Sequence, residues 1–497
     1  DRFIDVYNGR SDLDSRELLA VAQAVRHMGV IDPALYQDAL RAYDEAVAAD
    51  PDNLEAHLGT GTLFLSRLDA PEARNSFQEV LARWGQHPQA LLGLAEAAEF
   101  EGSDEVGLML DTALEVNSNL VPALVFRASR SLAEENGDAA EADLQAALQV
   151  NPSSAEALAV IAGMYLIRGM TDEYERTRDR ALGANPRDAQ FFVTVAELAS
   201  NVRFYAEAEA LAGRGAALDS LAWDAYGVQG LNQLRLGEIA AGRRNLEIAF
   251  EGDPYNVLIK NTLDLLDVMD TFEEFSSPSL NVYVDPEDGE ALAIYMTEVG
   301  ERALEDLSAR YRYRPETPIR VEAFRRSADF SVRTMGLAGI GALGVAFGRV
   351  VAMDSPSARG PQGFDWASTL WHELTHVVHM GMTEHRVPRW LTEGLAVHEE
   401  RRAGVSWGMR PSLAFFAAYI EDRVRPPSQL SQSFVRPRNP EEVGHAYVLG
   451  SLVAGWIEET QGFDAILDML EGYRDGRGPE DVMRRALGID LEELDRS

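Results

Sequence analysis

The first half of the chain alternates apolar stretches with polar breaks at a fixed interval. An Asn or Asp marks the end of each unit, and in three units a Pro follows it. Because each unit spans about 34 residues, it has room for two short helices and their turns. The pattern therefore predicts a stack of helical hairpins that bury their apolar faces against one another. The residues that mark the interval are Asn117, Asn151, Asn185, Asp219 and Asp253.

Small residues recur where the two helices of a hairpin must approach closely, and Tyr174 is the one departure. Over about residues 35–270 this pattern resembles the tetratricopeptide repeat family. The resemblance implies a surface that binds peptides or proteins, with a rigid spacer as the alternative. The small residues are Ala128, Ala162, Ala196 and Gly230 in first helices and Ala140, Ala208 and Gly242 in second helices.

The pattern changes after residue 271. Apolar and polar residues alternate from Leu280 to Val284, as in a half-buried strand. A long amphipathic helix is expected over 287–310, and strands over 317–324 and 349–354. We therefore expect an all-α superhelix followed by an α+β domain that becomes helical toward its end. The predicted domains are an N-terminal helical segment (1–34), the repeat array (35–272), a mixed β-sheet (278–360) and a helical part (361–497).

Composition narrows the chemistry. The absence of cysteine excludes disulfides and thiol catalysis, so a metal would need His, Asp or Glu ligands. A net charge of −36 argues against nucleic acid or anionic lipid as a partner. Residues 1–270 carry 45 acidic and 21 basic side chains, so partners of the array should be basic or neutral. No apolar run reaches the roughly 18–20 residues of a membrane span. From the excess of acidic residues we expect an extracytoplasmic bacterial protein, periplasmic or secreted.

The candidate chemistry lies in an apolar helical stretch. His372 and His376 are four residues apart, so both imidazoles share one helix face and can reach one metal ion. Glu373, in the same H-E-x-x-H motif, is placed to polarise a water molecule. A turn with Pro388 then leads to a second helix that carries Glu393. Two His and one Glu ligand fill three of the four positions around a zinc ion and leave one open, as in catalytic sites. The alternative is that the two His and the Glu are ordinary side chains on helix surfaces.

The segments HELTH and WLTEGLA together resemble the gluzincin metallopeptidases, the clan of thermolysin and aminopeptidase N. The resemblance is strongest to bacterial peptidase-MA-like proteins, which join such a domain to tetratricopeptide repeats. It covers about residues 278–496. It implies one Zn²⁺ per chain, held by His372, His376 and Glu393, with Glu373 as the general base that also carries the proton to the leaving amine.

The resemblance also implies a donor for the oxyanion. Tyr447 follows Glu393 at the spacing of the family's donor, in Y-V-L-G where relatives have Y-x-K-G. Its O–H would polarise the scissile carbonyl; a packed core Tyr is the alternative, and His445 is a second candidate donor. Glu400 shares a helix face with Glu393 and either bonds a ligand His or is solvated. His379 lies on the same stripe as the motif and borders the site.

Gluzincins bind an extended peptide as a strand added along a sheet edge. The resemblance places that edge in residues 341–354. Aminopeptidase N relatives carry there an acid that grips a free amino terminus, and this chain has none in the corresponding Gly341-Ala342-Leu343-Gly344. We therefore expect a zinc peptidase that cleaves within chains and whose array binds a substrate or partner. An aminopeptidase, and a peptide-binding scaffold with an inactive peptidase-like domain, are the alternatives. The expected edge residues are Gly344, Val345, Ala346 and Phe347.

Overall fold

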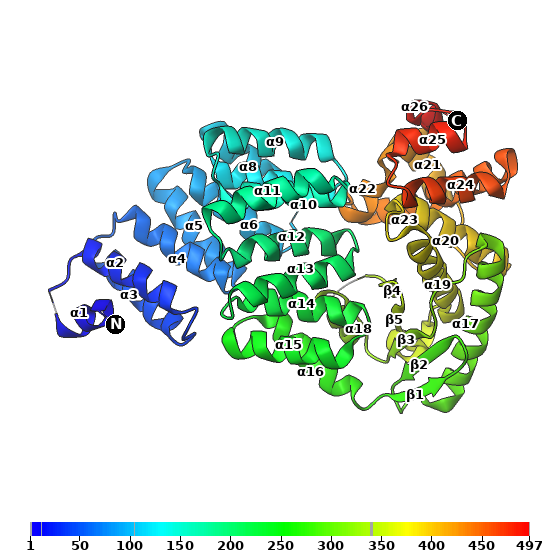
Figure 1. Ribbon diagram of the computed structural model, residues 1–497, viewed down its shortest axis with the longest axis horizontal. Helices are drawn as coiled ribbons and strands as arrows, with labels where there is room; N and C mark the ends of the chain where they lie inside the picture. The colour runs from blue at the N-terminus through cyan, green and yellow to red at the C-terminus, as the bar shows by residue number, and fades with distance from the viewer. Residues whose placement is uncertain (1, 11, 104, 338–340, 497) are drawn as a thin grey trace.

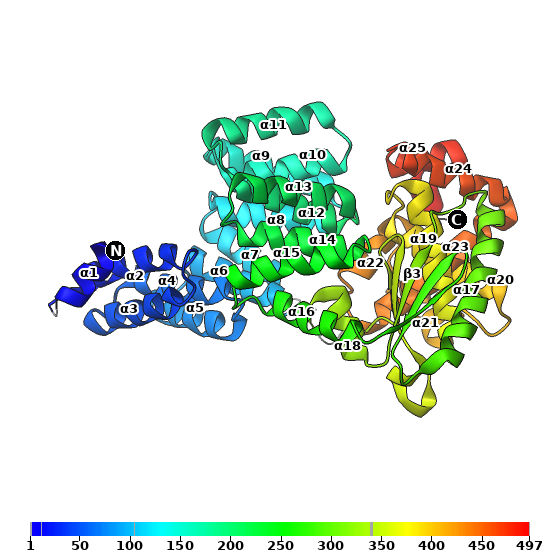
Figure 2. The same cartoon turned by 60° about the horizontal axis from the view of Figure 1, so that its bottom comes forward.

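The computed structural model describes residues 2–10, 12–103, 105–337 and 341–496. A curved stack of helices is followed by a five-stranded sheet with helices around it (Figure 1). The N-terminal helices and the sheet lie at opposite ends of the molecule (Figure 2). Within these ranges, no helix combines the length and the apolar character needed to cross a bilayer.

The helices of the first half follow the interval seen in the sequence. From α8 on, every second helix starts at this same interval, at Val121, Ala155, Ala189, Trp223 and Val257. The helices are α1 (Arg2–Gly9), α2 (Ser15–Met28), α3 (Leu35–Ala49), α4 (Leu54–Ser66), α5 (Ala70–Trp84), α6 (Pro88–Phe100), α7 (Val106–Val116), α8 (Val121–Ala133), α9 (Gly137–Val150), α10 (Ala155–Ile167), α11 (Thr171–Ala184), α12 (Ala189–Asn201), α13 (Tyr205–Leu218), α14 (Trp223–Arg235), α15 (Ile239–Gly252) and α16 (Val257–Met269).

The recurring Asn and Asp residues have a structural reason. Each one ends the second helix of a pair, and its side chain accepts a hydrogen bond from the backbone N–H two residues further on. In Asn151 this donor is Ser153, and in Asp253 it is Tyr255. Such Asx turns reverse the chain because the side chain takes the place of a backbone acceptor. The residues that mark the interval therefore form the turn between one pair and the next.

A second turn repeats inside each pair. Its central residue has positive φ at Glu135, Gly169, Arg203 and Gly237, which recur at the interval of the helices. The following N–H then bonds back to the carbonyl five residues earlier, as Phe204 does to Ala199 at 2.9 Å. This geometry is common at helix ends and is easiest for glycine. We call these four positions the intra-pair turns.

The small residues lie where the sequence predicts close helix approach. Ala128, Ala162 and Ala196 are completely buried. A methyl group added to Gly230 would lie only 2.9 Å from the carbonyl oxygen of Gly242 on the partner helix. The pairs are therefore packed too closely for larger side chains at these positions.

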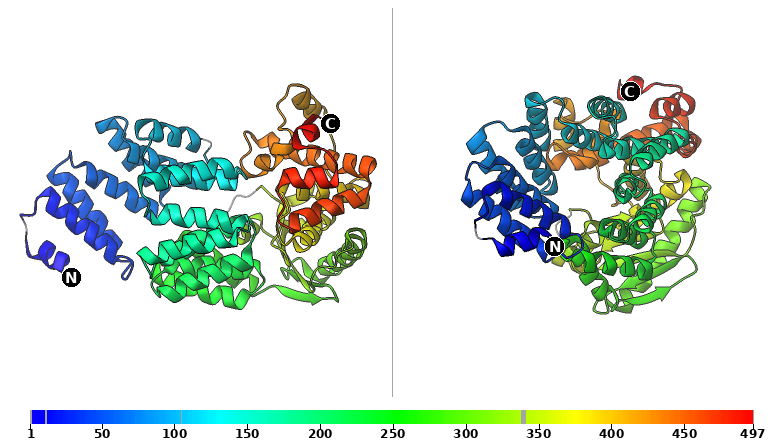
Figure 3. Two further views of the ribbon diagram at one scale, coloured as in Figure 1. Left: turned by 45° about the horizontal axis from the view of Figure 1, so that its top comes forward. Right: turned by 60° about the vertical axis from the view of Figure 1, so that its left-hand side comes forward.

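The array returns on itself. Arg67 at the end of α4 bonds Asp253 at 2.8 Å, and the indole of Trp223 donates to the backbone oxygen of Val30 at 2.8 Å. The N-terminal helices therefore contact the last repeat pairs, which lie beside them in the right-hand view of Figure 3. Helices α2 and α3 also pack on each other around Tyr43, so the predicted boundary at residue 35 falls within the first helix pair.

The sheet is mixed and begins at Glu273, between the predicted array and the predicted sheet domain. Its order is β1-β2-β3-β5-β4, so β4 forms one edge. β2 is parallel to β3 and β3 to β5, whereas β1 and β4 are antiparallel to their neighbours. The strands are β1 (Glu273–Ser276), β2 (Leu280–Val284), β3 (Ile319–Phe324), β4 (Gly344–Ala346) and β5 (Val350–Asp354).

Both faces of the sheet are covered. On one face, Val282 and Val321 pack with α17 and α19; on the other, Phe324 and Val350 pack with the last array helices in a second buried cluster. The remaining elements are α17 (Gly289–Tyr311), α18 (Ser327–Met335), η1 (Pro356–Gln362), α19 (Trp366–Thr383), α20 (Arg389–Ala403), α21 (Leu413–Ile420), η2 (Pro427–Gln429), α22 (Leu430–Val435), α23 (Pro440–Gln461), α24 (Phe463–Arg474), α25 (Pro479–Ala486) and α26 (Leu491–Arg496).

Candidate metal centre

Helix α19 carries the H-E-x-x-H motif through the interior of the second half. The side chain of Asp365 caps its N-terminus by accepting the N–H of Ser368 at 3.1 Å. Apolar residues on several sides bury the helix, among them Leu370 and Leu374 at 0% exposure. A buried helix holds its side chains in fixed positions, which a metal site requires.

Helix α20 is held against α23 by two glycines. A methyl group added to Gly394 would lie 2.5 Å from the backbone oxygen of Gly450 on α23. The glycine of the WLTEGLA segment is therefore a point of close helix contact. This contact fixes α20 and, with it, the neighbouring Glu393.

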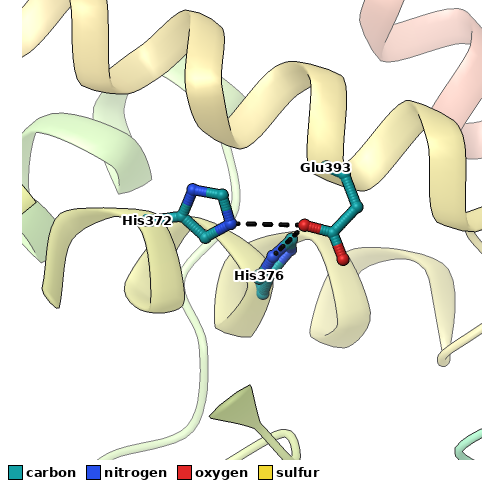
Figure 4. Close-up of side chains that lie close together, drawn as sticks. All are labelled: His372, His376 and Glu393. Carbon is teal, nitrogen blue, oxygen red and sulfur yellow. Dashed lines mark hydrogen bonds and ion pairs between the residues drawn. The ribbon is translucent and has the colours of Figure 1, made fainter. Parts of the chain in front are cut away.

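The three predicted ligands converge. Nε2 of His372 lies 3.3 Å and Nε2 of His376 lies 3.1 Å from the same carboxylate oxygen of Glu393 (Figure 4). One donor atom from each residue lies within 4.8 Å of the other two. Two imidazole nitrogens and one carboxylate oxygen at this separation are a donor set that suits a zinc ion with one open position.

The other ring nitrogen of each imidazole, Nδ1, forms a hydrogen bond on the side away from Glu393. Nδ1 of His372 donates to Glu400 at 2.6 Å, and Ser368 donates to the other oxygen of that carboxylate at 2.5 Å. Nδ1 of His376 lies 2.7 Å from the hydroxyl of Thr392. With both Nδ1 atoms bonded in this way, both Nε2 atoms face Glu393, as metal binding needs.

Thr392 also connects His379 to the site. Its hydroxyl lies 3.1 Å from Nδ1 of His379, so it can accept from His376 and donate to His379. The ring of His379 packs on Tyr311 with centroids 4.7 Å apart, and it is completely buried. His379 therefore supports the candidate ligand His376 through Thr392 and does not join the three converging donors.

The charges of the site depend on one another. Burial opposes ionisation of Glu393, but the two imidazoles hold its pKa well below the usual range. Burial also opposes the charge on His372, yet hydrogen bonds to Glu393 and Glu400 keep its pKa well above the ordinary value. Burial lowers the pKa of His376 and raises that of Glu373 to about 8. A bound dication would favour neutral imidazoles and ionised carboxylates.

Glu373 lies against the edge strand. The N–H of Ala346 bonds its carboxylate, and a methyl group added to Gly344 would lie 2.7 Å from its Cγ. Val345 and Phe347 complete the predicted edge segment, and Phe347 donates to Val350 at 2.7 Å across the hairpin. Because Gly344 has no side chain, the carboxylate of Glu373, the candidate base, has room beside the strand.

Tyr447 lies on α23 beside the ligands. The centroid of its ring lies 6.0 Å from the ring centroid of His372 and 5.0 Å from that of Phe434. Burial, followed by the nearby carboxylates, raises the pKa of Tyr447 well above its ordinary value, so the phenol keeps its proton. His445 packs instead against Phe415 of α21, with centroids 5.8 Å apart.

Thr392 and Ser368 are the site residues that the sequence analysis missed. Ser368 lies four residues before His372, a spacing that already predicts a shared helix face. Thr392 directly precedes the ligand Glu393, and only the crossing of α19 and α20 brings its side chain to His376. The first contact had a local signal, whereas the second had none.

Comparison with known proteins finds similarity to tetratricopeptide repeat proteins in the first half of the chain. The tetratricopeptide repeat family model matches residues 35–71 and 61–105. No curated protein matches the chain. A tetratricopeptide repeat protein from Parabacteroides merdae ATCC 43184 is similar at 21% identity and a TM-score of 0.35, over 50% of this chain and 97% of that one.

Two further solved structures are similar at lower TM-scores. A thermophilic repeat protein from Thermus thermophilus has 19% identity and a TM-score of 0.27, over 43% of this chain and 99% of its own. YrrB, a repeat protein with an unusual peptide-binding site, has 19% identity and a TM-score of 0.24, over 38% of this chain and 95% of its own. The family match over residues 35–105 and the constant interval of the later helix pairs support tetratricopeptide repeats in the first half of the chain, a scaffold suited to binding proteins.

Proposed function

We propose that the protein is a zinc-dependent peptidase of gluzincin type whose repeat array binds a substrate or partner. One observation carries the proposal: His372, His376 and Glu393 bring their donor atoms within 4.8 Å of one another, with Glu373 beside them. The hydrogen bonds that Glu400 and Thr392 make to the two imidazoles support it, because catalytic zinc sites hold their His ligands in this way.

The chain's own groups suit hydrolysis of a peptide bond. Zinc, when bound, supplies a Lewis acid that polarises the carbonyl and acidifies water. Glu373 takes the proton from the attacking water and delivers it to the leaving amine. The O–H of Tyr447 donates to the oxygen that gains negative charge, and its raised pKa keeps that proton in place.

The edge strand β4 supplies a place for an extended substrate. Its hydrogen bonds to β5 run through alternate residues, with Asp354 donating to Leu343 and Phe347 donating to Val350. The backbone N–H and C=O groups of Gly344 and Ala346 therefore face the open edge. A peptide added there would lie beside Glu373, which already contacts Ala346. Because the substrate strand runs past the site, we propose cleavage within a chain, with aminopeptidase action as the alternative.

The competing function is a protein-binding scaffold whose second half has no activity. The family match covers repeats alone, and a binding scaffold needs nothing from the second half. The charge of the array, 45 acidic against 21 basic side chains over residues 1–270, suits basic or neutral partners under either function. The buried and mutually hydrogen-bonded ligand set favours the peptidase, because a binding scaffold has no use for it.

Metal analysis and one variant separate the two functions. The purified chain should hold about one zinc per molecule and cleave an internally quenched peptide library. Glu373→Gln should abolish cleavage and keep the zinc, whereas Glu459→Gln, at an exposed position of α23, should keep both. A chain that takes up no zinc would overturn the proposal. Zinc binding without cleavage of any peptide would instead establish the scaffold, and comparison of free with acetylated N-termini identifies an aminopeptidase.

A further inference from the structure

The intra-pair turns form the edge of the array that meets the second half. The turn after α14 contacts the sheet region, where Arg333 donates to the backbone oxygen of Leu234 at 2.8 Å. Arg436 forms an ion pair with Glu134 at 3.3 Å, next to the intra-pair turn at Glu135. It also forms an ion pair with Glu99 at 2.7 Å, close to the corresponding turn after α6, where Gly102 has positive φ. The second half is thus docked on a row of equivalent turns.

The turn after α12 makes the contact that concerns the metal centre. Arg203 is its central residue, at φ 70°, where two equivalent repeats have Gly169 and Gly237. The guanidinium of Arg203 donates to the backbone oxygen of Val387 at 2.9 Å. Val387 belongs to the short connection between α19 and α20, the two helices that carry the ligands.

The next two residues of the array reach the same region. The ring of Tyr205 lies 6.0 Å from that of Phe347, directly after β4, and 5.9 Å from that of His385 in the α19–α20 connection. Arg386 places its guanidinium 5.6 Å from the ring centre of Phe204. The array segment 203–205 therefore touches both the end of the edge strand and the connection between the ligand helices.

The α19–α20 connection needs such support. Glu384 and His385 both have positive φ, at 49° and 65°, which is unfavourable for side chains of this size. Such a conformation persists where the surroundings hold it in place. The connection ends at Pro388, five residues before Glu393, so its path sets where α20 begins relative to α19.

We propose that the segment 203–205 is a positioning element of the zinc site. Arg203 and Tyr205 hold the α19–α20 connection, and through it the separation between His376 and Glu393. The inference rests on the proposed function. In addition to forming a binding surface, the array would help to keep the zinc ligands in position. Its residues act through the connection and touch neither substrate nor metal.

The test uses the full-length protein and substitutions at equivalent turns. Arg203→Gly removes the guanidinium and suits the positive φ of the backbone, so the fold should keep its melting temperature. Leu68→Gly makes the same backbone change, from φ 59°, in the corresponding turn after α4 and is the matched control. Arg203→Lys keeps a donor and should restore part of the effect. Tyr205→Phe, which keeps the ring, is paired with Tyr205→Ala.

Two readouts are measured: the zinc dissociation constant by chelator competition, and amide hydrogen exchange over residues 384–388. Arg203→Gly and Tyr205→Ala should weaken zinc binding about tenfold, as loss of ligand support does, and speed up exchange in the connection. Wild-type zinc affinity and exchange in both variants would overturn the inference. If the wild type takes up no zinc, the proposed function fails. In that case faster amide exchange over residues 384–388 in Arg203→Gly would still show that Arg203 holds the α19–α20 connection in place.

Discussion

The repeat array and the metal centre are both built from helices, but their contacts differ in sequence distance. In the array each helix packs mainly on the next, and the same turn returns in successive pairs. The candidate metal centre joins residues from β4, α19, α20 and α23, from Gly344 to Tyr447. A periodic structure spreads stability over many similar contacts, whereas the centre depends on a few contacts that occur once. Single substitutions should therefore have large effects in the centre and small ones in the array.

After Glu373, the largest effect is expected at Tyr447. Tyr447→Phe removes the proposed donor to the oxyanion and should lower kcat by about 10²–10³, with zinc content unchanged. His445→Gln is the control, because the ring of His445 packs on Phe415. Steady-state kinetics on one quenched peptide measure both variants. A large loss of kcat in His445→Gln with an active Tyr447→Phe would give the donor role to His445.

An intermediate effect is expected at Thr392. Thr392→Val removes the hydroxyl that contacts His376 and His379, and zinc affinity should fall about 10–100-fold. Thr392→Ser keeps the hydroxyl and should bind zinc nearly as the wild type does. Chelator competition measures both. Equal zinc affinity in the Val and Ser variants would show that the hydroxyl does not support the ligand.

The smallest effect is expected in the array, at Glu197. Desolvation by the surrounding helices and the charge of Asp224 raise the pKa of Glu197 to about 7, although its side chain keeps contact with solvent. Because the folded state then holds this proton more tightly than the unfolded chain, its contribution to stability is present below about pH 4.5 and is lost as pH rises through 7. Glu197→Gln should melt a few degrees above the wild type at pH 8, and the difference should vanish near pH 4.5.

Solvent access to the carboxyl keeps this effect modest. Glu207→Gln, at an exposed position of α13, is the control and should melt as the wild type does at both pH values. A difference between Glu197→Gln and the wild type that does not change with pH would rule out titration of this carboxyl as the cause.

The sequence predicted most where contacts are local. The tetratricopeptide repeats are confirmed, and the helix expected over 287–310 is α17 (Gly289–Tyr311). Helix spacing places Glu400 on the same face as Glu393 and leaves open whether it bonds a His or is solvated; in the structure it bonds His372 at 2.6 Å. The peptidase function stays a prediction.

What the sequence missed depends on distant segments. Strand β1 and helix α18 are short and have no long apolar pattern. The contact between Arg203 and Val387 joins residues 184 positions apart, and no local pattern distinguishes this Arg from others in the array. Periodicity shows which faces are buried, but it does not show against which distant segment they pack.

The covered second face of the sheet has a consequence for how this chain can be rearranged. Phe324, Phe330, Val350 and Ala352 are at most 1% exposed, and array helices provide much of that cover. A cut near residue 272 would therefore bare an apolar surface on the second half. The repeats and the sheet cannot be exchanged between proteins as independent modules, and a recombination event that keeps the second half folded must also keep the last repeats.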